Sequence, residues 1–317
     1  MNKNSFVSFI VPVYNSADTI KKCLESMQNI SYPKNKFEII LVDNNSKDRT
    51  IDIARKFTSK IYVDSTATIS TLRNIGAKKA KGDILCFVDA DCVISKGWLR
   101  DALENLKDDD AAMTSSKLYS VPEEASWVAR TWQVHLTGRN KGKKKVKWFA
   151  PCALAIKKHV FLSIAGFDES LVTCEDTDLG YRVGRKHRII SDKRLIFLHL
   201  HEPKTLFEFF QKEYWRGKDS VKVSLKYIKE PKEILSLMML VYYSILGTLF
   251  FPTIVIMFIT KNAIYATVVL FGLILPFVIV SFDTCRRTGE FLYFGKLMIV
   301  YATYVAARVR SIFWQKK

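Results

Sequence analysis

The sequence predicts an α/β domain with a mostly parallel sheet and helices on both faces, followed by C-terminal transmembrane helices. Three observations support this prediction. Apolar, β-rich runs alternate with helical patterns through residue 89. Residues 234–282 form an almost unbroken apolar block. Polar residues and carboxylates follow the apolar runs, where the strands of such a sheet should end.

The N-terminal elements alternate in a regular order. Helices are expected to begin near Thr19, Arg49 and Ser70. Each run between them is continuously apolar, as expected of parallel strands that are covered on both faces. The predicted strands cover residues 6–13, 37–43, 60–63 and 83–89.

In open α/β sheets, ligands bind beyond the carboxyl ends of the strands. The first strand is followed by "PVYNS", the second by "DNNSKDRT" and the fourth by "DADC". The sequence contains neither G-x-G-x-x-G nor G-x-x-x-x-G-K-[ST]. A dinucleotide fingerprint and a phosphate-cradling loop are therefore excluded.

Asp89 and Asp91 flank Ala90 at the end of the fourth strand. If the backbone stays extended, both side chains point the same way. Paired carboxylates repel each other unless a cation lies between them, and hard oxygen ligands suit Mg²⁺ or Mn²⁺. The alternative is that these aspartates only cap a turn or a helix.

A second acidic group, Glu175, Asp176 and Asp178, opens a helical pattern within residues 166–186. Acidic residues in a first turn complement the helix dipole, so capping is one interpretation. The other is a carboxylate general base that faces the metal site. Further on, His199 and His201 lie two apart on a predicted strand, where either could complete a metal shell or simply form hydrogen bonds.

The apolar block predicts two spans, about 234–259 and 263–282, joined by a short turn. Each is as long as the roughly 20 residues that a membrane helix needs. The alternative is a buried helical hairpin of a soluble protein. The N-terminus does not resemble a signal peptide, so residues 1–232 are expected to be cytosolic and residues 233–317 to form the membrane region.

The charge pattern predicts the orientation in the cell membrane. The turn between the spans carries only Lys261, so both termini are expected on the cytoplasmic side. Residues 291–314 could form a third span, but they fit better as an interfacial helix with Tyr301, Tyr304 and Trp314 at headgroup level. Such a helix would keep the charges of its C-terminal end beside anionic lipid.

The formal net charge of +18 raises the question of a nucleic-acid partner. The basic run "GRNKGKKKVKW" at 138–148 is not accompanied by a nucleic-acid-binding signature, so no nucleic acid is expected. The run is either a solvated loop or a contact for anionic lipid or a diphosphate. The six cysteines are scattered without a C-x-x-C pair and indicate reduced thiols.

Six motifs together indicate a resemblance to a known family: "VPVYN", "LVDNNSKDRT", "RNIGAKKAKGD", "FVDADC", "GFDE" and "CEDTDLGYR". Their order and spacing over residues 6 to about 218 resemble those of family 2 glycosyltransferases. The resemblance implies the type A glycosyltransferase fold. It also implies transfer of a sugar from a nucleotide diphosphate donor, usually with inversion at the anomeric carbon.

The resemblance also implies roles for individual residues. Asp43 would hold the base of the donor, Arg73 would lie near its phosphates, and Asp89 would face the ribose. The residues expected along the nucleoside are Pro12, Val13, Tyr14 and Asn15.

For the chemistry, the resemblance implies that Asp91 ligates Mn²⁺ or Mg²⁺, with Asp89 close by. Asp176 would be the general base, with Glu175 as the second choice. His199 or His201 would be a further metal ligand. A divalent metal would stabilise the leaving diphosphate while the carboxylate takes the proton of the acceptor.

The sequence departs from the processive polysaccharide synthases of this family, which carry a Q-x-x-R-W motif. The comparable stretch is "QKEYWRG", with Tyr214 in place of the arginine, which argues against cellulose-like or hyaluronan-like synthesis. Trp215 or Arg216 could contact the acceptor, or belong to an ordinary amphipathic helix.

The sequence thus predicts a membrane-bound enzyme that adds one sugar to a lipid-linked acceptor in the assembly of a cell-surface polysaccharide or glycoconjugate. A close variant uses polyprenyl phosphate itself as the acceptor. A sugar nucleotidyltransferase should open with a glycine-rich loop after its first strand, which is missing here. A catalytically silent membrane adaptor that keeps the fold is the alternative outside enzymology.

Overall fold

The computed structural model describes residues 5–116, 118–137, 142–146 and 152–313. The chain forms two compact units, which are described one at a time. The first comprises Met1–Glu124 and Asn140–Glu202, and the second Ala125–Arg139 and Pro203–Lys317.

The first unit begins with the alternation that the sequence predicts. Its strands are β1 (Val7–Val13), β2 (Phe37–Asp43), β3 (Ile61–Val63) and β4 (Ile84–Val88). The helices between them are α1 (Ile20–Gln28), α2 (Thr50–Ala54) and α3 (Ile69–Lys79), with a short 3-10 turn, η1 (Lys34–Lys36), before β2. The predicted strands and helix starts in this region are confirmed to within one residue.

The main sheet has the strand order β3-β2-β1-β4-β9-β6-β10-β8. The strands from β3 to β4 are parallel to one another, and β6 and β10 are parallel to each other. Two strands run antiparallel to their neighbours, β9 between β4 and β6 and β8 on the edge beside β10. The four strands beyond β4 are β6 (Ala111–Ser115), β8 (Lys143–Val146), β9 (Ala153–Lys157) and β10 (Arg188–Asp192).

A small second sheet lies in the same unit. It consists of β5 (Cys92–Ile94), β11 (Phe197–His199) and β7 (Tyr119–Ser120), with β11 in the middle. Strands of two or three residues are too short to show an alternating pattern, so of these three strands the sequence predicts only the one that carries His199. It matters because β5 follows "DAD" directly and β11 ends in His199.

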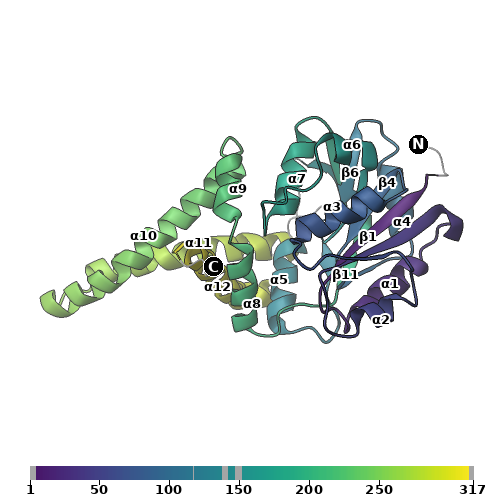
Figure 1. The fold of residues 1–317 in the computed structure, drawn as a ribbon. Helices are drawn as coiled ribbons and strands as arrows, with labels where there is room; N and C mark the ends of the chain where they lie inside the picture. Colours follow the sequence, from purple (N-terminus) through teal and green to yellow (C-terminus); the bar gives the residue numbers. More distant parts are fainter. Residues whose placement is uncertain (1–4, 117, 138–141, 147–151, 314–317) are drawn as a thin grey trace. The chain divides into compact units, whose positions relative to one another are not determined.

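Helices cover both faces of the main sheet (Figure 1). Along β1, Phe9 packs into the core beside α1, whereas its neighbour Ile10 packs into the core beside α3. Helix α3 approaches β1 very closely, because a Cβ on Gly76 would lie 2.4 Å from Ile10 Cγ2. The remaining helical elements of this unit are α4 (Trp98–Asn105), α6 (Lys158–Ser163), α7 (Glu175–Gly184) and η2 (Lys193–Leu195).

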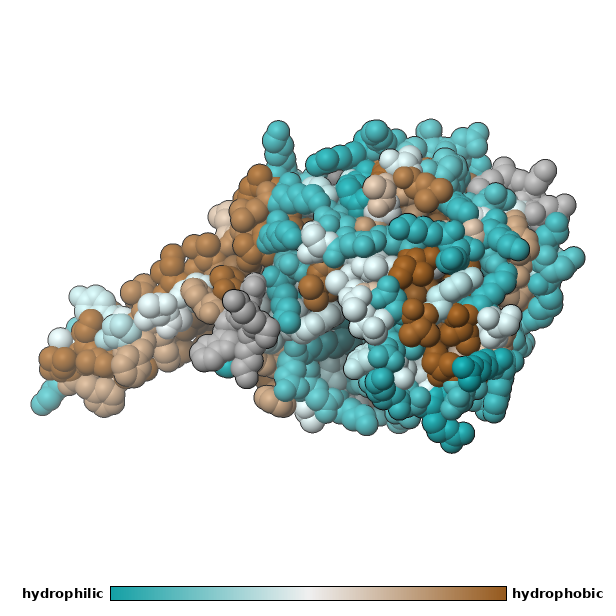
Figure 2. All heavy atoms as spheres, viewed as in Figure 1, coloured by the Kyte–Doolittle hydropathy of each residue, from teal (hydrophilic) through white to brown (hydrophobic). Residues whose placement is uncertain are grey.

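The second unit is helical in its described residues. Helices α10 (Pro231–Thr260) and α11 (Ile264–Thr288) form a hairpin, and both are long and apolar enough to cross a membrane. At 1.5 Å per residue they exceed the roughly 30 Å of a bilayer core. Their apolar side chains face outward (Figure 2), and only 6% of the most apolar stretch of each is buried, unlike a core hairpin. The other elements are α5 (Trp127–Thr137), α8 (Leu206–Arg216), α9 (Ser220–Lys226), η3 (Phe291–Tyr293) and α12 (Phe294–Phe313).

Helix α12 covers most of the predicted interfacial segment, but it packs against α8 and α5. The expectation that Tyr301 lies at headgroup level is wrong. Its side chain is 6% exposed, and its hydroxyl lies 2.7 Å from His135 Nδ1 and 2.9 Å from Thr284 Oγ1. Arg308 pairs with Glu213 of α8 at 2.8 Å. Trp314 lies outside the described residues.

The compact units do not coincide with the predicted division at residue 232. The second unit also contains α5 and α8, because both helices pack against α12. The division into compact units does not show where a membrane lies. The division into cytosolic and membrane-embedded parts therefore stays a prediction.

Candidate active site

The loops after β1 and β2 are joined by side-chain hydrogen bonds. Asn15 N donates to Ser46 Oγ at 2.9 Å, and Asn15 Oδ1 accepts from Lys47 N at 2.8 Å. Both loops contain a left-handed asparagine, Asn15 with φ 46° and Asn45 with φ 57°. Tyr14 is 59% exposed at the tip of the first loop. The two loops therefore form one structure at the carboxyl edge of the sheet, beside the predicted donor residues Pro12 and Val13.

Asp43 ends β2 opposite Val13 of β1. The side chain is buried, with its two oxygens accepting hydrogen bonds from the backbone N and the hydroxyl of Ser46. In this arrangement Asp43 holds the loop that Ser46 belongs to. Contact between Asp43 and a donor base remains a prediction.

The backbone turns after β4 and does not stay extended. Cys92 N donates to Asp89 O at 3.0 Å, which closes a turn over Ala90 and Asp91. The condition for both side chains to point the same way, an extended backbone, is therefore not met. The two carboxylates instead reach different partners.

Arg73 is the partner of Asp89. From the middle of α3, its Nη2 donates to Asp89 Oδ1 at 2.7 Å and its Nη1 donates to Glu175 Oε1 at 2.6 Å. The guanidinium is only 7% exposed, and it lies 5.2 Å from the ring centre of Phe167. A buried arginine thus joins the two acidic motifs. Its contact with donor phosphates stays a prediction.

The "RNIG" and "GFDE" motifs are locked together next to this arginine. Asn74 accepts from Phe167 N at 2.9 Å and donates to Phe167 O at 2.9 Å. Gly166 has a φ of +67°, and a Cβ there would lie 2.6 Å from Asn74 Oδ1. Only glycine fits this turn, because a side chain would be both strained and in contact with the amide.

Glu175 and Asp176 begin α7 after Cys174, which has a left-handed φ of 62°. Asp176 Oδ1 accepts from Thr177 N at 2.6 Å. The third carboxylate of the group, Asp178, pairs with Arg182 at 2.7 Å, and Arg182 also donates to Gly166 O. Asp178 thus has a structural role, and Glu175 is paired with Arg73. The hydrogen bond of Asp176 is with the adjacent Thr177.

Burial and neighbouring charges shift the pKa values of Asp89, Asp176 and Arg73. Burial raises the pKa of Asp89 to about 7 despite the Arg73 guanidinium beside it. Burial, together with the carboxylate of Glu175, raises the pKa of Asp176 to about 8. Burial alone would lower the pKa of Arg73, but Asp89 and Glu175 raise it, so the guanidinium stays charged. A carboxylate with a raised pKa is a better proton acceptor than a free one.

His199 is the partner of Asp91. Leu200 N donates to Asp91 O at 2.8 Å, and His199 Nε2 lies 3.5 Å from Asp91 Oδ2. On the other side of the ring, Nδ1 lies 3.1 Å from Glu202 Oε1, at an angle that departs from that of a hydrogen bond. Burial would lower the pKa of His199, but its neighbours Cys152 and Asp91 raise it to about 9. His201, beyond the end of β11, is exposed.

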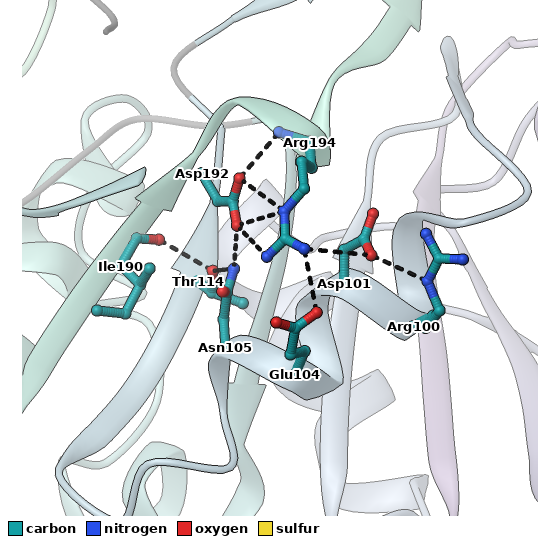
Figure 3. Close-up of polar contacts among 8 residues, drawn as sticks. All are labelled: Arg100, Asp101, Glu104, Asn105, Thr114, Ile190, Asp192 and Arg194. Carbon is teal, nitrogen blue, oxygen red and sulfur yellow. Dashed lines mark hydrogen bonds and ion pairs between the residues drawn. The ribbon is translucent and has the colours of Figure 1, made fainter. Parts of the chain in front are cut away.

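A polar network fixes the segment that leads into β11 (Figure 3). Asp192 at the end of β10 accepts from Arg194 Nη2 at 2.8 Å and from Asn105 Nδ2 at 3.1 Å. Arg194 also donates to Glu104 of α4 at 3.0 Å. These bonds tie η2 to α4 and β10, so the start of β11, and with it His199, has a fixed position.

Three residues near the site were missed by the sequence analysis: Cys92, Cys152 and Glu202. Asp89 N donates to Cys152 O at 2.9 Å, which brings the residue before β9 to the turn after β4. Cys92 directly follows "DAD", a signal that could have been used. Nothing local marks Cys152, because antiparallel pairing between β4 and β9 brings it there.

The predicted acceptor residues lie in the second unit. Trp215 is 46% exposed, and Arg216 donates to Glu213 at 2.8 Å. Of the basic run, residues 143–146 form the edge strand β8, whereas residues 138–141 and 147–148 lie outside the described residues.

The first unit thus gathers four carboxylates and a histidine at the carboxyl edge of its sheet. Asp91 and His199 together offer oxygen and nitrogen ligands that suit a divalent cation. Asp176 offers a carboxylate with a raised pKa. This set can bind a metal with an anionic ligand and remove a proton from a hydroxyl group.

Comparison with known proteins agrees with these motifs. Residues 8–163 match the family model described as Glycosyl transferase family 2. The glycosyltransferase AglE of Haloferax volcanii is 26% identical over 232 residues, which cover 69% of this chain and 74% of the relative. A dolichyl N-acetyl-alpha-D-glucosaminyl phosphate 3-beta-D-2,3-diacetamido-2,3-dideoxy-beta-D-glucuronosyltransferase of Methanococcus voltae is 31% identical over 107 residues, 32% of this chain and 33% of the relative. In further relatives, the matched segment covers 13% to 46% of each one's length.

Among solved structures, the mannosyltransferase PcManGT from Pyrobaculum calidifontis, in complex with GDP-Man and Mn²⁺, has a TM-score of 0.65 at 17% identity. The alignment covers 99% of this chain and 88% of that one. This likeness concerns the fold, and it confirms the predicted type A glycosyltransferase architecture.

Proposed function

The chain belongs to glycosyl transferase family 2, and on this premise we propose that it transfers a sugar from a nucleoside diphosphate donor to a lipid-linked acceptor, with inversion and with a divalent cation. The product would be part of a cell-surface polysaccharide or glycoconjugate. The observation that carries the proposal is the pairing of Asp91 with His199 beside the Arg73-linked carboxylates Asp89 and Glu175.

The residues present fit a divalent cation. His199 Nε2 and Asp91 Oδ2, 3.5 Å apart, could both turn toward one ion, and Glu202 lies on the far side of the imidazole, as second-shell carboxylates do. When bound, Mn²⁺ or Mg²⁺ supplies electrostatic stabilisation of the diphosphate leaving group. His199 is preferred to the exposed His201 as the ligand.

Asp176 is proposed as the general base. The acceptor hydroxyl oxygen attacks the anomeric carbon of the donor, the bond from that carbon to the diphosphate oxygen breaks, and Asp176 takes the hydroxyl proton. Attack from the face opposite the leaving group inverts the anomeric carbon. Glu175 is less suited as a base, because its Oε1 already accepts from the Arg73 guanidinium at 2.6 Å.

The donor is proposed to lie along the joined loops after β1 and β2. Exposed Tyr14 would cover the nucleoside, with Pro12, Val13 and Asn15 beside it and Asp43 directed to the base. Asp89 would contact the ribose through the oxygen that Arg73 does not engage. These placements rest on the resemblance of the motifs and on the shared carboxyl edge.

The α10/α11 hairpin supports a membrane-bound acceptor. The hairpin exposes apolar side chains on two helices of 30 and 25 residues, and its turn carries only Lys261, whereas Arg286 and Arg287 lie at the other end of α11. By the positive-inside rule, the catalytic domain would face the cytoplasm. The Methanococcus relative is named for a dolichyl-linked substrate, which agrees with a lipid-linked acceptor.

The test is a donor screen with the full chain in detergent, read out by released nucleoside diphosphate. UDP-, GDP- and dTDP-sugars are supplied with Mn²⁺ or Mg²⁺ and with membrane lipid extract. We expect turnover with one donor that needs both the cation and the lipid, and that falls at least about 100-fold in Asp91→Asn. Full turnover in the presence of a chelator would refute the metal requirement.

The acceptor is identified from the same reaction by using two lipid substrates. Polyprenyl phosphate and a polyprenyl diphosphate sugar are offered separately, and the radiolabelled product is extracted. Sugar on the second substrate alone supports the proposal, and sugar on the first alone favours the polyprenyl-phosphate variant. Labelling of Asn262→Cys by a membrane-impermeant reagent added to intact cells tests the orientation, because this turn should lie outside.

A further inference from the structure

Two cysteines and a histidine meet at the turn after β4. Cys92 opens β5, and the antiparallel pairing of β5 with β11 puts His199 directly opposite it. Cys152 joins them because its carbonyl oxygen accepts from Asp89 N at 2.9 Å. The two Sγ atoms and a ring nitrogen of His199 all lie within 4.8 Å of one another.

Asp91 completes a set of four side chains. Its Oδ1 lies 3.6 Å from Cys92 Sγ, and its Oδ2 lies 3.5 Å from His199 Nε2. The ligand atoms of a tetrahedral zinc site, with Zn–S near 2.3 Å and Zn–N near 2.0 Å, are about 3.5 Å apart. The spacing seen here is close to that value, and shifts of about 1 Å would reach it.

We propose that the thiols of Cys92 and Cys152, together with His199, bind a soft divalent cation, of which Zn²⁺ fits best. Asp91 supplies the fourth ligand. Two sulfur ligands distinguish this site from an oxygen-rich magnesium or manganese site, because thiolates select zinc over hard cations. The two sites share Asp91 and His199 and differ in the two sulfurs.

The surroundings of the thiols support a ligand role over plain packing. A buried cysteine most often acts as a small apolar residue, as Cys86 does among the core side chains of the sheet. Cys92 has a carboxylate and an imidazole next to its sulfur instead. Cys152 is half-buried.

Zinc binding must release protons. A cysteine thiol that binds no cation is ordinarily protonated at neutral pH. On binding, Zn²⁺ forms bonds to both sulfurs and to a ring nitrogen of His199, so the two thiol protons and the proton that the imidazolium carries on that nitrogen pass to the solvent. Binding should therefore tighten as the pH rises, and the released acid can be measured directly.

One consequence rests on the proposed function. A cation held by both thiols also occupies Asp91 and His199, so these two residues are no longer available to the catalytic metal. Zn²⁺ binds to nitrogen, oxygen and sulfur ligands more tightly than Mn²⁺ does. Zinc should therefore inhibit transfer, and Cys92 and Cys152 should make the inhibition strong.

The test uses Co²⁺ as a spectroscopic probe on the full chain in detergent, with a non-thiol reductant. Cobalt bound to thiolates gives strong near-ultraviolet charge-transfer absorption and tetrahedral visible bands. We expect these bands to saturate at one equivalent of Co²⁺ and to disappear when Zn²⁺ is added. They should be lost in Cys92→Ser and weakened in Cys152→Ser, two variants made separately so that poor folding of one leaves the other informative.

Cys86→Ala is the matched control, because it removes another buried thiol from the adjacent strand β4 and should retain the bands. Wild-type protein without charge-transfer absorption would overturn the proposal, and so would bands that persist in both serine variants. In the transfer assay with Mn²⁺, the zinc concentration for half inhibition should rise at least about 10-fold in Cys152→Ser. The cobalt spectra decide the site even if no donor is turned over, so failure of the zinc site and failure of the proposed function are distinguishable.

Discussion

Arg73 Nη2 donates to Asp89 Oδ1 at 2.7 Å, and this bond joins the middle of α3 to the turn after β4. The opposite terminal nitrogen of Arg73 holds Glu175 at the start of α7. One buried cation thus fixes two acidic motifs that lie far apart in the chain.

Replacing this arginine should destabilise the first unit and stop transfer. Arg73→Met leaves the buried carboxylate of Glu175 and the half-buried one of Asp89 without their cation, and breaking a buried ion pair typically costs about 3–5 kcal/mol. Chemical denaturation of the full chain in detergent measures the loss. Arg55→Met, at an exposed ion pair on the surface, should change the free energy of unfolding by only about 0.5 kcal/mol. Equal effects of the two variants would argue against the joining role of Arg73.

Substitutions of the two acidic residues at the start of α7, Glu175 and Asp176, should have different effects. Asp176→Asn should reduce turnover by about 100-fold to 10,000-fold while donor affinity remains, because only a general base is lost. Glu175→Gln should lower thermal stability as well as turnover, because it weakens a buried ion pair with Arg73. Calorimetry of donor binding and the thermal midpoint distinguish the two. Near-normal turnover in Asp176→Asn would show that Asp176 is not the general base.

The raised pKa of Asp176 predicts a pH-dependent stability. The folded protein holds this proton up to about pH 8, whereas the unfolded chain releases it near pH 4. The stabilisation is therefore present below about pH 4 and is lost as the pH rises to 8. Above pH 8, metal-free Asp176→Asn should melt a few degrees higher than the wild type, since 1 kcal/mol shifts a domain of this size by about 2–4 °C. No difference between pH 4 and pH 9 would contradict the raised pKa.

Glu202 should act on the metal through His199. Glu202→Gln weakens the partner on the far side of the imidazole, so the Mn²⁺ concentration for half activation should rise about 10-fold to 100-fold. Turnover at saturating Mn²⁺ should change much less, because no reacting group is removed. His201→Gln changes an exposed histidine beyond the strand and serves as the control. A fall in turnover that saturating Mn²⁺ does not restore would point to a different role.

Gly76 should be intolerant of even a methyl group. Alanine normally stabilises a helix relative to glycine by about 1 kcal/mol. Here the added Cβ would lie 2.4 Å from Ile10 Cγ2, so Gly76→Ala should instead destabilise by about 1–3 kcal/mol. Lys78→Ala, at an exposed position of the same helix, should be close to neutral. Thermal unfolding of the two variants measures the difference.

The sequence predicts the regular half of the fold well. Strands such as β1 and β2 are buried on both faces, so their largely apolar runs mark them directly. The acidic start of α7 and the helical hairpin are equally visible in the composition. These elements depend on local pattern, which a sequence displays.

The details of the site depend on distant pairing, which the sequence does not display. An extended "DAD" would place both carboxylates on one face, but the hydrogen bond from Cys92 N to Asp89 O turns the backbone and sends them to different partners. Cys152 reaches the site only because β9 runs antiparallel to β4. Glu202 lies beyond the end of β11, yet its Oε1 is 3.1 Å from His199 Nδ1. Each of these contacts was set by tertiary structure.

The bond between Arg73 and Glu175 spans 102 residues of chain, which has a consequence for the time at which the enzyme becomes active. At a synthesis rate of about 5–20 residues per second, the ribosome makes α3 roughly 5–20 s before it makes α7. During that interval the guanidinium has no carboxylate at the start of α7 to bind. The nascent N-terminal half can therefore form its parallel strands early, but Asp176 and His199 join it only when the last strands are added. A truncated chain that ends before α7 therefore lacks both Glu175 and Asp176, and we expect it not to carry out transfer.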